Sequence, residues 1–421
     1  MKLFKLSLAA AIAAGALATS ASAVPLEEAI KDVDLNGYAR MRYTHNNKSN
    51  DVVHRDKSSS WEFKSEVDFK AKIDDNFFGV VGIRFMDRDN GQSRSSSNTV
   101  YHNGPNSKDK DADFDIAKAY LGYTVGGTVI AVGRQGIGSF FTDDMYGDGV
   151  KITSTDIEGL TLTGFWMDSL ENDGDIGSLD WNYKAPFPAD GTGKLTTDHN
   201  LYGVGAMGSY DPVAFQLWYN SLEDVADLFA AELAFNFDIS DDFNIGVKGQ
   251  YAFSDFDKAS YGHWDNTAVP PVFVTDVEVG DADFWAAEVS MGLFGIDLAG
   301  GYLRFEPDNK DRASFVSFED QGSFISPGEQ LLDYTNFTGK NEYWYVVAGY
   351  TIPDTGIRIG ADYLDGKSAG QDAYEAVGRI SYKYNQKLSF KTWYSHYKVD
   401  GAAGAADEKN DRIRFEAKYS F

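Results

Sequence analysis

The last ten residues of the chain, RIRFEAKYSF from Arg412 to Phe421, alternate strictly between polar and apolar side chains. The apolar members are Ile413, Phe415, Ala417, Tyr419 and Phe421. Successive side chains of a β-strand point to opposite faces, so the segment predicts a strand with one apolar and one charged face. Its length matches the ~9–11 residues with which a tilted strand crosses a bilayer core. The segment therefore predicts the closing strand of a transmembrane β-barrel.

The same alternation recurs along the chain and predicts an all-β protein. Between Trp61 and Ile73, largely apolar residues alternate with Glu, Asp and Lys over 13 residues. This run is longer than the ~5–6 residues typical of strands in globular proteins. Counting all such segments predicts an antiparallel transmembrane barrel of about 18 strands, in which the closing strand pairs with Gly37–Thr44.

The connections between these strands alternate between short and long. Tight turns at 74–76 and 126–127 are typical of the short ones. The long polar stretches are residues 88–112, 169–199, 254–282 and 306–341. Short periplasmic turns and long external loops are the pattern of an outer-membrane barrel. The alternative, a soluble protein of several β-sandwiches, leaves such long loops unexplained.

Charge and targeting signals narrow the class of protein further. Residues 1–23 combine Lys2 and Lys5, an apolar run and Ala21-Ser22-Ala23, which predicts a signal peptide ahead of one barrel domain at 24–421. The chain has a net charge of −26, and losing the two lysines takes it to −28. This acidity argues against nucleic acid as a partner, because phosphates attract Lys and Arg. No cysteine is present, so thiolate chemistry and disulfides are excluded.

Five segments carry a resemblance to a known family: PLEEAIKDVDLNGYARMRY at 25–43, LYGVGAMGSYD at 201–211, FEDQG at 318–322, IRIGADY at 357–363 and EAVGRISYKYNQKLSFKTWYSHY at 375–397. They resemble the major outer membrane protein porins of Campylobacter and its relatives. The resemblance covers essentially the whole mature chain. It implies an 18-stranded, homotrimeric general porin, surrounded by outer-membrane lipid. Such a porin would let small hydrophilic solutes and cations pass.

A barrel of this size has an aqueous lumen unless a segment narrows it. The segment QGIGSFFTDDMYGDG at 135–149 resembles the third loop of general porins, which folds into the lumen. Asp143, Asp144 and Asp148 are then the predicted acidic constriction. The predicted basic wall opposite comprises Arg40, Arg42, Lys64, Lys70, Arg84, Lys118 and Arg134. Opposed charges create a transverse field that orients dipolar solutes, and the acidity predicts mild cation selectivity. The alternative for the loop acids is a solvated surface turn.

The resemblance also implies an acidic calcium site near the constriction. The candidate ligands are Glu319, Asp320, Asp173, Asp175 and Asp148. Ca²⁺ takes roughly 6–8 oxygen ligands, so carboxylates from several loops would have to converge on it. No single stretch supplies a complete ligand loop.

Two other classes of function are open. The six histidines lie in no G-x-S-x-G or H-E-x-x-H context, so we do not expect an enzyme. A substrate-specific channel, or an adhesin acting through the external loops 169–199, 254–282 and 306–341, is the alternative to a general porin. Tyr419 and Phe421 resemble the terminal signal recognised by the barrel assembly machinery.

Overall fold

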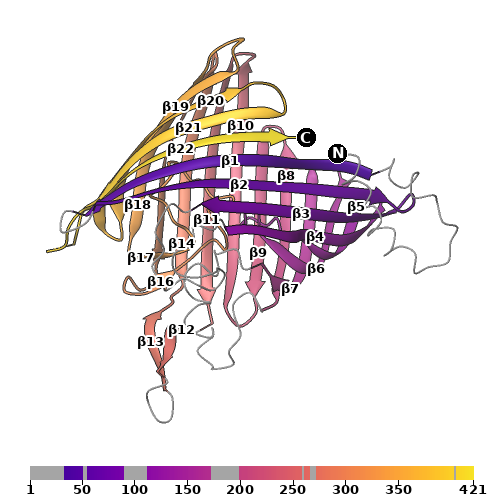
Figure 1. The fold of residues 1–421 in the computed structure, drawn as a ribbon, viewed down its shortest axis with the longest axis horizontal. Coiled ribbons are helices and arrows are strands. Elements are labelled where there is room, and N and C mark those ends of the chain that lie inside the picture. Colours follow the sequence, from indigo (N-terminus) through magenta and orange to yellow (C-terminus); the bar gives the residue numbers. More distant parts are fainter. Residues whose placement is uncertain are drawn as a thin grey trace.

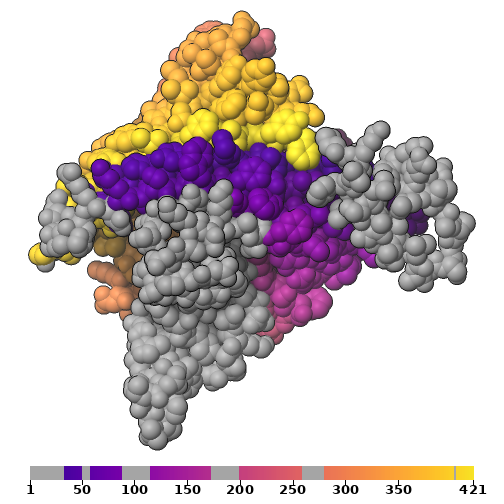
Figure 2. Space-filling model, in the orientation of Figure 1, coloured from indigo at the N-terminus to yellow at the C-terminus, as the bar shows by residue number. Residues whose placement is uncertain are grey.

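The computed structural model describes residues 33–50, 55–89, 111–171, 199–257, 260–265, 272–402 and 404–421. Its main element is a closed sheet of 18 antiparallel strands. The sheet closes because β1 (Val33–Asn50) pairs with both β2 (Arg55–Lys72) and β22 (Glu408–Ser420). Figure 1 shows β1 in indigo lying along β22 in yellow, and the two colours also adjoin on the surface in Figure 2. The predicted transmembrane barrel of about 18 strands is confirmed.

The other strands of the wall follow in chain order. They are β3 (Phe77–Asp89), β4 (Asp111–Val125), β5 (Thr128–Gly136), β6 (Tyr146–Ile157), β7 (Leu160–Leu170), β8 (Leu201–Tyr210), β9 (Val213–Leu222), β10 (Ala226–Ser240), β11 (Phe243–Phe256), β14 (Ala282–Leu293), β15 (Ile296–Pro307), β18 (Asn341–Thr351), β19 (Ile357–Ser368), β20 (Gln371–Lys383) and β21 (Leu388–Val399). Two hairpins form separate small sheets: β12 (Ser260–Asp265) with β13 (Val272–Glu278), and β16 (Ala313–Ser314) with β17 (Phe337–Thr338). In the described part of the chain, no helix is both long and apolar enough to span a membrane.

The closing strand makes the predicted contacts with β1. Gly37 and Phe421 exchange backbone hydrogen bonds, with N···O distances of 3.0 and 3.1 Å. Further along the pair, Arg42 lies opposite Glu416, and its Nη2 donates to the Glu416 carboxylate at 2.8 Å. The seam is therefore held by a continuous ladder and by an ion pair on its lumen face.

The two faces of the wall have opposite character. The outward face exposes large apolar side chains, including Ile413 and Tyr419 of β22 and Phe63 of β2. The alternate positions carry charge and point into the barrel, as Lys64 and Arg42 do. An exposed apolar belt around a charged interior is the arrangement that a lipid bilayer stabilises.

The first two strands extend beyond the predicted segments. Each has 18 residues, because the ladder of backbone hydrogen bonds continues through the polar residues 45–50 and 55–60. Apolar alternation marks only the part of a strand that faces lipid, so it missed this extension. Similarly, the predicted loop 254–282 contains the β12–β13 hairpin.

The segment between β15 and β18 contradicts one prediction. Residues 306–341 were expected to be an external loop, but much of this segment is buried inside the barrel. Phe318 and Tyr334 are fully buried, together with Phe315 and Val316. The physical reason is that the segment is rich in aromatic side chains, which pack on an apolar surface on the lumen side of the wall. Of the other two predicted adhesin loops, 254–282 contains the β12–β13 hairpin, and residues 172–198 of the loop 169–199 lie outside the described residues.

Candidate pore constriction

The loop between β5 and β6, residues 137–145, enters the barrel and packs against its inner wall. Ile137, Phe140 and Phe141 are almost completely buried, because their apolar side chains face wall and loop rather than water. Lys151 of β6 donates its Nζ to the carbonyl oxygen of Ile137 at 2.7 Å. On the far side, the Asn220 amide of β9 donates to the Ser139 hydroxyl at 3.0 Å. The first part of the loop is therefore fixed to two different strands, β6 and β9.

Its two aspartates remain accessible while the aromatic residues are buried. Asp143 and Asp144 are both exposed. The Asp144 carboxylate accepts a hydrogen bond from Lys64 Nζ of β2 at 2.6 Å. Asp143 lies within electrostatic reach of Arg40 and Lys418 on the neighbouring strands β1 and β22. The loop thus presents carboxylates toward a basic wall, in the arrangement that the sequence predicted for these two residues.

A second loop, residues 308–340 between β15 and β18, is joined to the first by backbone hydrogen bonds. The Phe318 N–H donates to the Phe141 carbonyl at 2.9 Å, and the Ser323 N–H donates to the Phe140 carbonyl at 2.7 Å. The Glu319 carboxylate also accepts the backbone N–H groups of residues 143 and 145, at 2.9 and 2.7 Å. The two loops consequently form one body, which we call the constriction element (residues 137–145 and 308–340).

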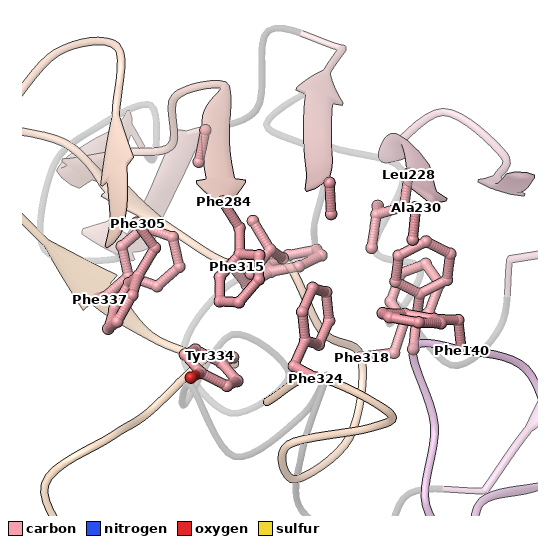
Figure 3. Packing of buried hydrophobic residues seen from close by; sticks show 14 of the residues in the cluster. Phe140, Leu228, Ala230, Phe284, Phe305, Phe315, Phe318, Phe324, Tyr334 and Phe337 are labelled. Atoms are coloured by element: carbon pink, nitrogen blue, oxygen red, sulfur yellow. The ribbon is translucent and has the colours of Figure 1, made fainter. Parts of the chain in front are cut away.

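Aromatic packing anchors the constriction element to one half of the wall. Figure 3 shows Phe324 between Phe140 and Tyr334, close to Phe284 of β14. The ring centroids of Phe140 and Phe324 are 4.9 Å apart, and those of Phe284 and Phe324 are 4.6 Å apart. A buried aromatic side chain removes ~150–250 Å² from water, worth about 25 cal/mol per Å². Several such rings hold the loop in the lumen against the entropy of releasing it.

A later stretch of the second loop is held by carboxylates of β19 and β20. Glu375 of β20 is completely buried and accepts the backbone N–H groups of residues 329–331 at 3.0 to 3.3 Å. Asp362 of β19 accepts the Gly328 N–H at 3.0 Å. Gly328 has φ +88°, and a Cβ there would lie 2.6 Å from a Glu375 carboxylate oxygen, so only glycine fits. The second loop therefore crosses the lumen between two parts of the wall.

The wall beyond the constriction element is rich in cations, and we call it the cationic face. It comprises the lumen-facing Arg40, Arg42, Arg379, Lys391, Arg412, Arg414 and Lys418 of β1 and β20–β22. Arg379 and Lys391 lie 3.1 and 3.4 Å from the Glu329 carboxylate of the second loop. Arg40 pairs with Glu62 at 2.7 Å. A cleft of about 360 Å³ is lined by Asp143, Asp320, Gln321, Gly322, Ser326, Pro327, Gly328, Glu329, Gln330 and Leu332.

The predicted basic residues other than Arg134 fall into three groups. Arg40, Arg42 and Lys64 lie beside the constriction element, as described above. Lys70 faces the lumen further along β2, with its Nζ 4.2 Å from the centroid of the Phe78 ring. Arg84 and Lys118 face inward but are engaged by carboxylates. Lys118 Nζ, for example, lies 2.6 Å from Glu66 and 2.7 Å from Asp68.

Two predicted residues lie on the other side of the wall. Arg134 of β5 precedes the inward-facing Gln135, so its side chain points outward, and Asp148 lies opposite it on β6. Both residues share the outer face with the exposed Val132 and Ile152. Arg134 Nη1 lies 3.1 Å from the Asp148 carboxylate. The two charges form an ion pair with each other on the outer surface, so neither residue contributes to the constriction. The error arose because residues 146–149 were assigned to the loop, whereas β6 begins at Tyr146 and pairs with β5 in unbroken register, which places Asp148 opposite Arg134.

The candidate calcium ligands are not brought together in the described residues. Glu319 uses its carboxylate to join the two loops, Asp320 lines the cleft, and Asp148 lies on the outer surface. Among the described residues, no group of three or more acidic or histidine side chains is placed to hold a metal ion. Asp173 and Asp175 lie outside the described residues. The calcium site stays a prediction, and the described members of the set do not fit one ion.

Sequence reasoning missed most of the cationic face. Arg412 and Arg414 were placed on the charged side of the closing strand, but their position opposite the second loop was not recognised. The signal was present, because every charged position of a barrel-closing strand must face the lumen. Glu375 and Glu329 were also missed, because their role depends on a loop that was expected to lie outside.

Acinetobacter baumannii OccAB3 is 14% identical with a TM-score of 0.64, over 92% of this chain and 100% of that one. Pseudomonas aeruginosa OccK8 (OprE) is 16% identical with a TM-score of 0.65, over 92% and 98%. Pseudomonas aeruginosa OpdQ is 13% identical with a TM-score of 0.64, over 92% and 99%. At these identities the likeness shows the fold alone.

No curated protein matches the sequence. The family model described as Campylobacter major outer membrane protein matches residues 1–421, the whole chain. The chain therefore belongs to the Campylobacter major outer membrane protein family and is a porin-type β-barrel channel of the bacterial outer membrane.

Proposed function

We propose that this channel is a general diffusion porin that passes ions and small hydrophilic solutes, with a mild preference for cations. One observation carries the proposal: accessible carboxylates of the constriction element oppose the cationic face across the lumen. Asp143 and Asp320 both line the cleft at that position. A water-filled passage with charge on both sides favours polar solutes over apolar ones, which cannot replace the ordered water.

The preference for cations follows from how the charges are paired. On the cationic face, Arg40, Arg42 and Arg379 each contact a carboxylate, which cancels most of their field. Asp143 is exposed at the cleft. The whole chain carries a net charge of −26, so its vestibules attract cations as well.

Reversal potentials in planar bilayers test this proposal. Purified protein is inserted between two KCl solutions that differ tenfold in concentration, and the zero-current voltage is measured. We expect a voltage of the sign set by potassium and well below the value for an ideal cation channel. A voltage of the sign set by chloride contradicts the preference, and the absence of discrete channels contradicts the function itself.

We also propose that the protein forms homotrimers and is assembled through its C-terminus. The trimer rests on the family resemblance, and the Arg134–Asp148 pair on the outer surface supports it, because a charged pair is costly against lipid alone. Sedimentation in mild detergent tests it, and a monodisperse monomer is the contrary result. For assembly, deleting Phe421 should lower the surface yield strongly while the remaining channels conduct normally. An unchanged yield would refute the terminal signal.

A further inference from the structure

Two arginines on the lumen side of β22 differ from the other cations of the cationic face. Arg412 and Arg414 contact no carboxylate within salt-bridge distance among the described residues. They are two positions apart on one strand, so their side chains point the same way with backbones roughly 7 Å apart. The β22 register places Arg412 opposite Asn46 and Arg414 opposite Thr44 of β1.

The contacts of Arg412 and Arg414 fix both side chains but use only some of the guanidinium N–H donors. Arg412 donates its Nε to the Asn46 amide oxygen at 2.5 Å, and Arg414 donates its Nε to the Thr44 hydroxyl at 3.2 Å. The Arg414 guanidinium also lies over the Trp393 ring, 5.0 Å from its centroid. In both arginines, the two terminal nitrogens have no acceptor in the described part of the chain. Both groups are therefore oriented and have free N–H donors.

The surroundings concentrate positive charge at this point. Arg42 lies close enough to Arg414 to repel it, but its own charge is countered by Glu416. The nearest acid of the second loop, Glu329, is already shared between Arg379 and Lys391. Like charges held together without a counterion are unfavourable in a partly buried site, so an anion entering this place gains free energy.

We propose that Arg412 and Arg414 form a binding site for a carboxylate, or a small oxyanion of similar geometry, carried by a solute in the lumen. The planar guanidinium presents paired N–H donors that match the two oxygens of a carboxylate. Contacts through Nε and Trp393 hold the fork in place, which lowers the entropic cost of binding. The proposal rests on the proposed channel function and specifies one class of solute for it.

Competition in bilayer recordings tests the site. Current through the channel is measured in KCl at constant ionic strength while potassium malonate is added to one side. We expect a saturable fall in current in the wild-type protein. In the double variant R412Q/R414Q, the half-effective malonate concentration should rise at least fivefold. The matched control R134Q removes an arginine charge from the outer surface, so its half-effective concentration should equal that of the wild type.

Two further variants separate binding from a general change in field. E329Q removes an acid of the second loop that attracts both arginines, so it should lower the half-effective malonate concentration. R414K keeps the charge but loses the planar fork, so it should raise that concentration at least twofold. R414K also provides an answer if the double variant does not assemble.

Sulfate identifies the chemistry of the ligand. Equal effects of sulfate and malonate assign the site to oxyanions in general, whereas an effect of malonate alone assigns it to carboxylates; both support the proposal. An unsaturable malonate effect in the wild type, or equal half-effective concentrations in the wild type and R412Q/R414Q, overturns it. A cation-selective channel that malonate does not affect overturns only the site. A channel selective for chloride overturns the proposed cation preference independently.

Discussion

The two halves of the inner wall treat the constriction element differently. On β10, β11, β14 and β15, the inward positions near the loop are apolar or small, as at Ala230, Ala252 and Phe284, and the aromatic residues of the loop pack on them. On β1 and β19–β22, many inward positions are charged, and hydrogen bonds and ion pairs hold the loop there. The apolar half determines where the loop rests, and the charged half determines where water and solutes remain.

The largest expected effect comes from removing the aromatic anchor. In F318A/F324A, each truncation removes a buried ring at a cost of roughly 3–5 kcal/mol in a packed core, so the second loop should leave the wall. Single-channel conductance should at least double. The matched control F63A/F85A truncates a pair of rings on the outer surface, whose centroids are 5.9 Å apart. If both double variants conduct like the wild type, apolar burial does not hold the loop.

A smaller effect is expected at the hydrogen-bonded end of the same loop. E375A leaves the three backbone N–H groups of residues 329–331 without their acceptor, at about 1–3 kcal/mol for each group that water does not reach. Because the aromatic anchor persists, we expect increased open-channel current noise with only a modest rise in conductance. E342A, which alters an outward-facing carboxylate, is the control. If the open-channel current of E375A is no noisier than that of the wild type, the charged half does not position the loop.

Ionic selectivity should respond to the accessible acid of the first loop. D143N removes a charge that lines the cleft, so the ratio of potassium to chloride permeability should fall roughly twofold. D148N is the matched control, because Asp148 lies on the outer surface beside Arg134. Reversal potentials of the two variants give the comparison directly. Equal shifts of the reversal potential in both variants would show that Asp143 does not lie at the constriction.

The smallest effect is expected from Lys70. It lies six positions from Lys64 along β2, or roughly 20 Å, which exceeds the Debye length of about 8–10 Å at physiological salt. K70Q should therefore change the permeability ratio by less than about a fifth of the change in D143N. A shift as large as that of D143N would mean that the narrowest part of the lumen lies nearer to the periplasm.

The wall could be predicted from sequence because its pattern is local. In β2 and β22, each residue's face follows from its neighbours two positions away, and lipid enforces the alternation. The extension of β1 through Asn50 was missed because polar hairpins pair without that constraint. Asp148 was misplaced because it was read as part of the inserted loop, whereas β6 already begins at Tyr146 and Asp148 follows the alternation of the wall.

The constriction element was only half predicted, because its contacts are distant in sequence. Asp143 and Asp144 lie in a segment with recognisable glycines and aspartates, whereas the second loop was read only as polar and long. A physical signal was nevertheless available in β14, where FWAA at 284–287 is apolar on both faces. In a barrel, a strand that is apolar on its inner face requires something apolar inside. The aromatic residues of 315–337 could have been predicted to pack on this inner face.

The join between the two loops has a consequence for how the channel forms. The hydrogen bond from the Asp143 N–H to Glu319 spans 176 residues of sequence. Contacts of such separation form late, because the chain between them must first be ordered. We therefore expect the wall to pass through a wide, open stage before it narrows. The width of the finished passage is then a property of late folding, and a slow step there would appear as large, unselective conductance in newly inserted channels.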